Sequence, residues 1–457
     1  RGYGYSGQAN TDYGYSYTDW YGAYKGVMQN KFRKADGTFD YGAVEELNAN
    51  NENGSIMVMT KAKNYHNWYG LVSTYNTKLT KDIDFYGGVD FRFYKGTHTN
   101  DIVDLYGGKY FIDSTRKSVK PENNANAANQ SWVYQKLGVG DAVYRDYDGH
   151  VVQEGAFFQA EYSKNGLSSF LSGSLSNTSY WRYDRLYYDK KNAESETKNY
   201  LGFTVKGGAN YNFNEHHNAF FNVGYISRAP KFNYGAFLSF ASSNVTNPDA
   251  KNEKVVSFEL GYGYRLKWLQ VDVNAYWTKW LDKTMAKSST VGTAQVDAFV
   301  NMTGVNALHK GIEIEAKASP LYWLDVNAMF SIGDWKWDSN AKGYVFDYNG
   351  QPLTKDGSIA SGIGAEDHLS TGINLKGIHV GGAAQTTAAL GATIKIGKEI
   401  RIGADWTLYA RNYAYYSISG SNLSLGKTNT VADPWRVPTA SQFDLNASYK
   451  FKIAGLN

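Results

Sequence analysis

The stretches AFFNVGYISRAPKFNYGAF, residues 219–237, and TNPDAKNEKVVSFELGYGYR, residues 246–265, decide the fold of this chain. Their outer ends have the pattern of β-strands, and the polar, aromatic-rich sequence between them predicts a long loop. Residues 258–266 place one set of side chains on an apolar face, namely Phe258, Leu260, Tyr262, Tyr264 and Leu266. The opposite face carries Ser257, Glu259, Gly261, Gly263 and Arg265. Such a strand has an apolar medium on one side and water on the other, so the apolar medium is either a protein core or lipid.

Composition excludes several classes of protein. The 457 residues include no cysteine, which excludes disulfides and thiolate metal sites, and they are rich in aromatic residues and glycine (38 Tyr, 12 Trp, 22 Phe, 47 Gly). The formal charge of +4 is spread out rather than gathered in a basic patch, so no nucleic-acid partner is expected. No run approaches the ~18 apolar residues of a membrane helix. The mean hydropathy of −0.50 suits a soluble protein, but it also suits a membrane β-barrel, in which alternate residues face water.

From Trp68 onward the chain repeats one unit, a strand of roughly ten to thirteen residues. Connections between these strands alternate between very short and very long, and Asn165-Gly166 is a strong signal for a tight hairpin. The predicted strands are 68–79, 83–95, 152–163, 167–179, 201–213, 217–228, 255–266, 268–280, 309–319, 323–333, 386–396, 400–412 and 442–452. Short turns on one side and long loops on the other are typical of outer-membrane barrels.

We therefore predict an all-β fold, a transmembrane antiparallel up-and-down β-barrel, with an aromatic-rich extracellular loop region at 1–67 and a partial barrel at 68–457. A barrel must close, because unpaired backbone groups in lipid cost several kcal/mol each. The alternative is a soluble multi-sheet protein. Soluble sandwiches do not usually gather their long connections at one end, and their turn signals recur every 8–12 residues.

The sequence also predicts that this barrel is incomplete. The strands at 68–79 and 442–452 each lack a neighbour on their outer side, and thirteen strands do not suit a single-chain bacterial barrel with an even count. We expect the chain to be a fragment of a larger barrel.

Aromatic residues at or near the predicted strand ends indicate the membrane–water interface, where ring and polar tip occupy different media. Packing against neighbouring loops is the alternative for any single one. These residues are Trp68, Tyr94, Tyr180, Trp181, Trp268, Trp280, Trp323 and Trp335.

Several segments resemble the barrel of TonB-dependent outer-membrane receptors. They are GYISRAPKFNYGAF (224–237), NPDAKNEKVVSFELGYGYR (247–265), NMTGVNALHKGIEIEAKASP (301–320), SIGDWKWDSN (331–340) and DPWRVPTASQFDLNASYKF (433–451). YRDYDGH (144–150) and AEYSKNGLSSFLSGSLSNT (160–178) are similar to the Bacteroidetes branch of that family. The resemblance implies a 22-stranded barrel, of which about 13 strands are present here, in the outer membrane of a Gram-negative bacterium. It also implies an N-terminal plug and uptake powered by the TonB complex, but nothing in this sequence resembles the plug or the closing strands.

Motifs for catalysis are missing from the sequence. The eight histidines are scattered without HExxH or paired metal spacing, and no nucleophile or phosphate-binding motif is present. We expect no enzyme activity, no metal and no cofactor. Asp146-x-Asp148-Gly149 resembles part of a calcium loop, but an ordinary Asp-Gly turn has the same sequence.

Two groups of residues are candidates for ligand contact. A row of aromatic side chains in the first loop could stack on a flat ligand, or could instead pack on other loops or face lipopolysaccharide: Tyr13, Tyr15, Tyr17, Trp20, Tyr21 and Tyr24. A second group should face the barrel lumen, where it hydrates the lumen, pairs with a plug or touches ligand: Asp90, Arg92, Glu259, Arg265, Glu313, Glu315 and Lys317.

The expected function is TonB-dependent uptake of a scarce, bulky nutrient: a metal chelate, haem, cobalamin, a glycan or a peptide. The alternative is a passive or structural surface barrel, that is, a porin, an adhesin or an assembly scaffold. Expected partners are outer-membrane lipid and lipopolysaccharide, together with the TonB complex through the plug. A surface lipoprotein is a further candidate partner.

Overall fold

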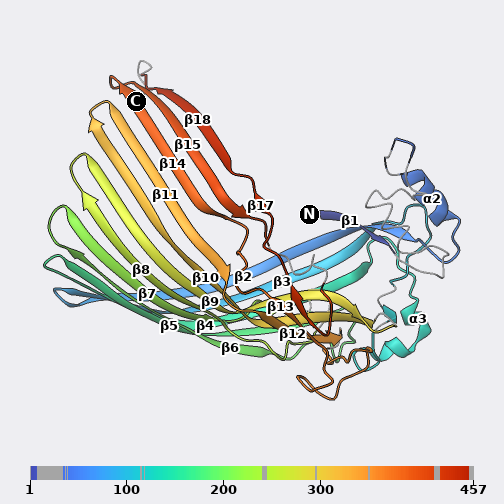
Figure 1. Cartoon of the computed structure of the whole chain (residues 1–457). Helices are drawn as coiled ribbons and strands as arrows, with labels where there is room; N and C mark the ends of the chain where they lie inside the picture. Colours follow the sequence, from blue (N-terminus) through green and yellow to red (C-terminus); the bar gives the residue numbers. More distant parts are fainter. Residues whose placement is uncertain are drawn as a thin grey trace.

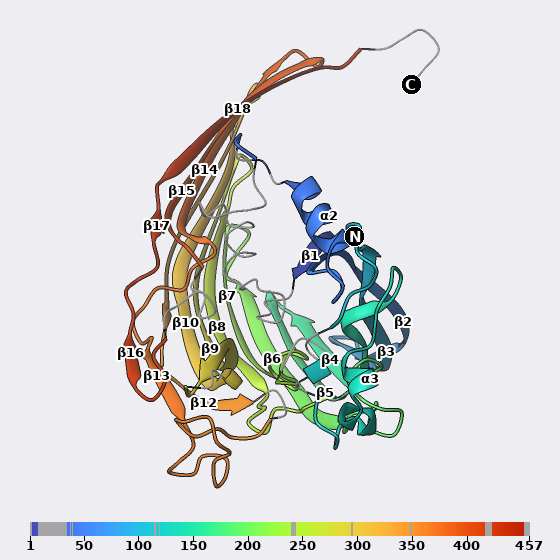
Figure 2. The ribbon, with the colours of Figure 1, turned by 90° about the vertical axis from the view of Figure 1, so that its right-hand side faces the viewer.

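The computed structural model shows a chain that is nearly all β. It describes residues 2–7, 34–36, 38, 40–113, 116–117, 119–238, 244–293, 296–347, 350–415 and 423–451. Within these residues, eighteen strands form a single sheet (Figures 1 and 2).

Thirteen long strands form an antiparallel meander, in which each strand pairs with the next long strand along the chain. This confirms the predicted fold class, and each predicted strand has its counterpart. The long strands are β2 (Met57–Thr80), β3 (Ile83–Asp104), β4 (Ala142–Lys164), β5 (Leu167–Asp184), β6 (Lys198–Asn212), β7 (His217–Arg228), β8 (Glu253–Arg265), β9 (Leu269–Val291), β10 (Val296–Leu321), β11 (Leu324–Trp337), β14 (Ala384–Ile396), β15 (Ile400–Tyr413) and β18 (Ala440–Tyr449).

All tight turns lie at one end of the sheet, the turn end, and all long connections lie at the other, the loop end (Figure 1). The loop end carries the short elements β1 (Gly2–Gly7), α2 (Tyr41–Ala49), η3 (Ala125–Ala128), α3 (Gln130–Val133), β12 (Ala341–Asp347), β13 (Ser370–Asn374), β16 (Thr428–Thr430) and β17 (Arg436–Val437). No helix in the described ranges is both long and apolar enough to cross a bilayer.

The sheet curls into a C and does not close (Figure 2). Its two edges are β2 and β18, which do not pair with each other in the described part of the chain. At the β2 edge, β1 covers only the backbone of residues 57–62. Beyond that point, the outer side of β2 and the outer side of β18 carry no strand among the described residues.

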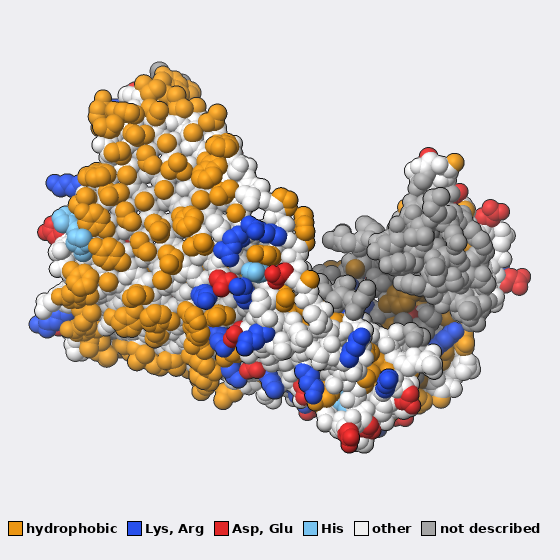
Figure 3. Space-filling model, in the orientation of Figure 1, with side chains coloured by type: hydrophobic (Ala, Val, Ile, Leu, Met, Phe, Trp, Pro, Cys, Tyr) orange, Lys and Arg blue, Asp and Glu red, His pale blue; other side chains and the backbone are white. Residues whose placement is uncertain are grey.

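The convex face of the C is apolar (Figure 3). Register fixes this face across neighbouring strands, because Leu260 of β8 lies opposite Phe221 of β7 and Ala275 of β9. Large apolar side chains exposed on this face include Val89, Phe91, Phe158, Leu171, Leu175, Phe203, Val205, Phe221, Val223, Phe258, Leu260, Ile312, Ile314, Phe330, Ile332, Leu390, Ile394 and Ile402. A soluble protein rarely exposes so large an apolar surface, so the apolar face of 258–266 meets lipid.

Strands reach further at the loop end than predicted. β2 begins at Met57, inside the range predicted as loop, and β10 begins at Val296. These extensions lose the alternating pattern because loops pack over them and form small cores above the apolar band. One such core consists of Val58, Ile102, Phe111, Leu137 and Val143. A larger one joins the tips of β9 and β10 to β12 and β13 and includes Val291, Val300, Val345, Leu353 and Ile373.

The same substitution by arginine should affect stability very differently on the two faces of β8. Leu260→Arg would place a cation at the centre of the apolar band and should destabilise the folded protein by about 2–4 kcal/mol. Glu259→Arg, on the opposite face, should change the free energy of unfolding by about 0.5 kcal/mol or less. Equilibrium unfolding of the full-length protein in lipid vesicles measures both values, and equal losses would contradict the assignment of the two faces.

Candidate ligand-binding surface

The predicted lumen-facing residues all lie on the concave face of the sheet. Register places them opposite the apolar set, and several bind polar neighbours. Arg92 Nε lies 3.3 Å from Asp90 Oδ2, and Asn222 Nδ2 donates to Glu259 Oε2 at 3.3 Å. Arg265 lies 3.6 Å from Asp272. Glu313, Glu315 and Lys317 follow one another on this face of β10.

The aromatic residues predicted at the membrane interface fall in three places. Trp181 lies on the convex face, where its ring stacks on His150 at 4.8 Å. Trp268 and Trp323 lie in tight turns. The others lie on the concave face: Trp68, Tyr94, Tyr180, Trp280 and Trp335. Position along a strand gives depth in the membrane, but a shift of one residue exchanges the two faces, so depth alone does not give the face.

Two of these residues belong to a group that we name the concave aromatic patch: His66, Trp68, Tyr94, His98 and Tyr147, from β2, β3 and β4. Trp68 lies directly opposite Tyr94, and His66 stacks on Tyr94 with ring centroids 6.1 Å apart. His98 lies 5.0 Å from Tyr147. Trp68 is 65% exposed and Tyr94 is 38% exposed, so their rings are available to a ligand.

Burial favours the neutral form of His98 within this patch. Burial lowers its pKa below the ordinary value of 6.5, and the charges of Arg145 and Arg182 lower it further against the opposing effect of Asp148. Its Nδ1 lies 2.7 Å from Asn64 Oδ1, which fixes the ring plane. A neutral imidazole beside exposed rings offers hydrogen bonding without charge repulsion toward a cationic ligand.

A buried arginine holds the loop of the opening stretch beside the patch. Arg182 of β5 is completely buried, and its guanidinium lies 4.8 Å from the ring of Tyr147, 5.3 Å from Phe232 and 4.5 Å from Phe237. It also donates to Asn233 Oδ1. Burial lowers the pKa of Arg182 to about 10, so the group remains charged at neutral pH. The aromatic faces stabilise the cation, and the loop is thereby fixed over the concave face.

A second anchor ties the chain after β5 to β4. Arg185 lies 2.7 Å from Asp146 and 2.8 Å from Asp148, and Lys95 lies 2.9 Å from Asp148. Burial alone would raise the pKa of Asp148, but hydrogen bonds from Arg185, Thr97 and Lys95 outweigh burial and hold it well below 3.8. The two carboxylates of the partial calcium motif thus bind Arg185. Among the described residues, no group of three or more His, Asp or Glu could hold a metal ion.

A hollow of about 800 Å³ lies at the loop end beside the tips of β9 and β10. Charged residues at its wall include Lys355, Asp356, Glu366 and Asp367. His368, also at the wall, is buried and bound by backbone: Gly364 N donates to its Nδ1 at 2.9 Å, and its Nε2 lies 2.9 Å from Val345 O. It therefore joins the loop at Gly364 to β12.

The first-loop aromatic residues, from Tyr13 to Tyr24, lie outside the described residues. Conversely, sequence reasoning gave no ligand role to His66, His98 or Tyr147. The signal that could have found them is the phase of β2 and β3: residues 64, 66 and 68 share a face, as do 94, 96 and 98.

Replacing Asp148 tests the second anchor. Asp148→Asn removes the charge that Arg185 and Lys95 share, and bonds to charged groups contribute about 1.5–3 kcal/mol, so amide exchange across 184–195 should rise roughly ten- to hundredfold. Because the folded pKa lies below 3.8, protection in the wild type should persist from pH 7 to pH 5 and be lost only in stronger acid. Asp84→Asn, in the exposed pair with Lys78 at the turn end, is the matched control. Unchanged exchange in Asp148→Asn would refute the anchor.

Among solved structures, the chain is similar to the copper transporter OprC, with 13% identity, a TM-score of 0.53 and coverage of 87% of this chain and 50% of that chain. It is similar to the siderophore receptor PiuA of Acinetobacter baumannii, with 13% identity, a TM-score of 0.50 and coverage of 87% and 50%. It is also similar to BauA, the ferric preacinetobactin receptor of the same organism, with 11% identity, a TM-score of 0.50 and coverage of 87% of this chain and 49% of that chain. The chain thus spans about half the length of these proteins, and identities this low establish the fold alone.

No curated protein matches the chain in sequence. A family model described as TonB dependent receptor-like, beta-barrel, matches residues 1–457. This chain therefore belongs to the TonB-dependent receptor β-barrel family.

Proposed function

We propose that this chain forms part of an outer-membrane receptor that imports a scarce, bulky nutrient, and that the concave aromatic patch contacts that nutrient. The observation that carries the proposal is the exposed pair of Trp68 and Tyr94 on the polar face of a lipid-embedded sheet. Lipid does not reach this face, and no described core covers the two rings. Exposed rings on the wall of a lumen are suited to ligand capture.

The patch favours ligands with flat or apolar faces. Tyrosine and tryptophan stack on such faces at low entropic cost, and His66 and His98 add hydrogen-bonding groups. Metal chelates, haem, cobalamin, glycans and aromatic peptides all present such faces. Copper and siderophore transport are named for proteins of similar fold, which supports a metal chelate as the first ligand to test. We also propose that the first-loop residues Tyr13–Tyr24 contact the ligand.

The proposal requires a closed barrel. Edge strands in lipid leave backbone groups without partners at several kcal/mol each, and further strands joining β2 to β18 would remove that cost. Structures of similar fold belong to chains about twice as long, which supports such strands and a plug inside the C. We propose that the loop end faces the outside of a Gram-negative cell, that the TonB complex acts through the plug, and that the protein belongs to the Bacteroidetes branch. A surface lipoprotein would be a partner at the loop end.

A passive or structural barrel is the competing function. It would leave the concave aromatic patch without a specific ligand, and the seven concave charged residues would only hydrate the lumen. Family membership disfavours it, because the family is one of TonB-dependent receptors.

Adjacent residues of β2 provide a matched test. Trp68 and Tyr69 are both 65% exposed, but Trp68 lies on the concave face and Tyr69 on the convex face. Trp68→Ala should weaken binding of the ligand that co-purifies with the full-length receptor by about tenfold, and Tyr69→Ala should leave the affinity unchanged. Mass spectrometry identifies the ligand and titration calorimetry measures its affinity. Equal affinity in both variants would reject the patch as the ligand site.

A further inference from the structure

Charged side chains gather on the convex face where its apolar surface ends toward the loop end (Figure 3). On the convex face of β10, Ile314 and Ile312 are followed toward the loop end by Lys310. On the convex face of β11, Ile332 is followed in the same direction by Asp334 and Lys336. The lysines therefore follow the last apolar residues directly. A position one step beyond the apolar band is where lipid headgroups lie.

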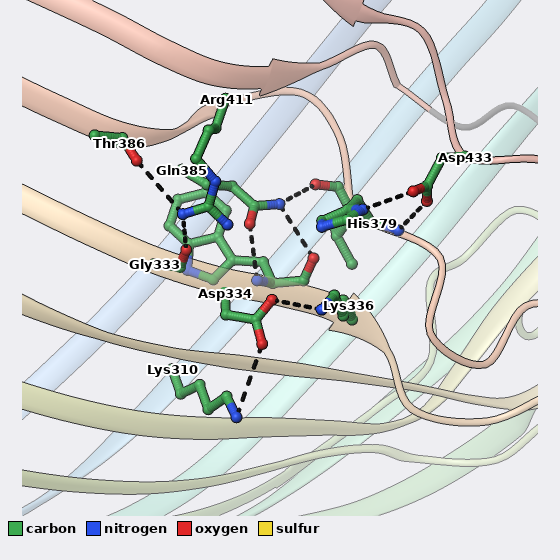
Figure 4. Close-up of polar contacts among 11 residues, drawn as sticks. Lys310, Gly333, Asp334, Lys336, His379, Gln385, Thr386, Arg411 and Asp433 are labelled. Carbon is green, nitrogen blue, oxygen red and sulfur yellow. Dashed lines mark hydrogen bonds and ion pairs between the residues drawn. The ribbon is translucent and has the colours of Figure 1, made fainter.

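Two lysines share one carboxylate in this region, and an arginine binds the backbone of the residue before it (Figure 4). Lys336 Nζ lies 3.0 Å from Asp334 Oδ1, and Lys310 Nζ lies 3.7 Å from Asp334 Oδ2. Arg411 of β15 reaches across β14 and donates to Gly333 O at 2.9 Å, immediately beside Asp334 in the sequence. We name Lys310, Lys336 and Arg411 the convex basic cluster.

Positive charge in the cluster exceeds what the local carboxylates neutralise. Asp334 is shared by two lysines, and Arg411 forms no ion pair with a carboxylate of the described residues. The next carboxylate, Asp433, is bound by His379, at 2.9 Å from the backbone nitrogen and 3.0 Å from Nδ1. Nearby outward-facing lysines differ, because each has a carboxylate of its own. Lys279 lies 2.6 Å from Asp338, and Lys254 lies 2.7 Å from Asp282.

The guanidinium of Arg411 is held by the backbone carbonyl of Gly333 at 2.9 Å and lies 3.5 Å from the hydroxyl of Thr386. Arg411 has φ of 52°, in the left-handed region that residues other than glycine rarely adopt. Beside it, Gln385 is buried and bonds both backbone groups of Trp335, accepting from its nitrogen at 3.0 Å and donating to its carbonyl at 3.1 Å. These contacts fix the junction of β11, β14 and β15, so a strained residue presents its charge at a defined point.

We propose that the convex basic cluster binds the phosphate of a phosphorylated glycolipid in the outer leaflet of the membrane. This inference rests on the proposed function, because it takes the loop end to face outward. Arginine and lysine together suit a phosphate, arginine through paired N–H donors and lysine as a point charge. The apolar side chains directly below, Ile312 and Ile332, would contact acyl chains of the same molecule, which a soluble phosphate lacks.

Native mass spectrometry of the full-length protein in detergent tests the proposal. The probes are bisphosphorylated lipid A, the same lipid after removal of both phosphates, and inorganic phosphate. We expect the wild-type protein to retain phosphorylated lipid A and to retain the other two probes at least about tenfold less. The triple variant Lys310→Gln, Lys336→Gln, Arg411→Gln should lose about tenfold of the lipid retention. A triple variant at the turn end, Lys81→Gln, Lys267→Gln, Lys398→Gln, removes equal charge and should retain the lipid.

Asp334→Asn separates a binding role from a structural one. Removing the shared carboxylate increases the net positive charge, so retention of phosphorylated lipid A should rise several-fold, whereas a purely structural ion pair would give equal or lower retention. Equal retention of the dephosphorylated lipid, equal competition by inorganic phosphate, or unchanged retention in the cluster variant would overturn the proposal. Nutrient affinity should be the same in the cluster variant as in the wild type. The Trp68→Ala variant should show the reverse, a weaker nutrient affinity with unchanged retention of phosphorylated lipid A, so the two proposals are tested separately.

Discussion

Backbone hydrogen bonding in lipid governs this structure. Inside a bilayer no water satisfies the N–H and C=O groups, so each strand must pair with a neighbour on both sides. β3 to β11, β14 and β15 meet this requirement through continuous antiparallel ladders. Only the edges β2 and β18 lack a second long neighbour in the described part of the chain. The curvature of the C, which brings the two edges toward the same side, is the geometry in which additional strands could satisfy them (Figure 2).

Strand alternation then divides every strand between two media. The convex face receives apolar residues and ends at the loop end in charged residues that suit headgroups, while the concave face receives charged and hydrogen-bonding residues. Trp68 and Tyr69 show how sharp this division is, because these neighbours in sequence lie on the concave and the convex face, respectively. Beyond the apolar band, toward the loop end, the strands no longer alternate, and buried ion pairs and cation–π contacts hold the loops in place. Arg182 holds the loop at Phe232 and Phe237, and Arg185 holds the chain after β5.

The sequence predicts the architecture well because one physical rule produces its pattern. Alternating short and long connections locate all thirteen strands and their pairing, and the 258–266 stretch shows both faces correctly. Three features escape this reasoning. Strand extensions such as residues 57–60 do not alternate, since loops cover them. The face of Trp68 was not predicted, because aromatic residues at 68 and 69 occupy both phases of the strand. The contacts of Arg182 join residues about fifty positions apart, which no local pattern reveals.

The central claim is that alternate residues of β8 face lipid and water. The chain has no cysteine, so single cysteines can be introduced at each position from Phe258 to Arg265 and spin-labelled in the full-length protein in lipid vesicles. Accessibility to oxygen, which concentrates in lipid, should peak at 258, 260, 262 and 264. Accessibility to a water-soluble nickel complex should peak at 259, 261, 263 and 265. Equal access of the nickel complex to both sets would contradict a membrane-spanning sheet.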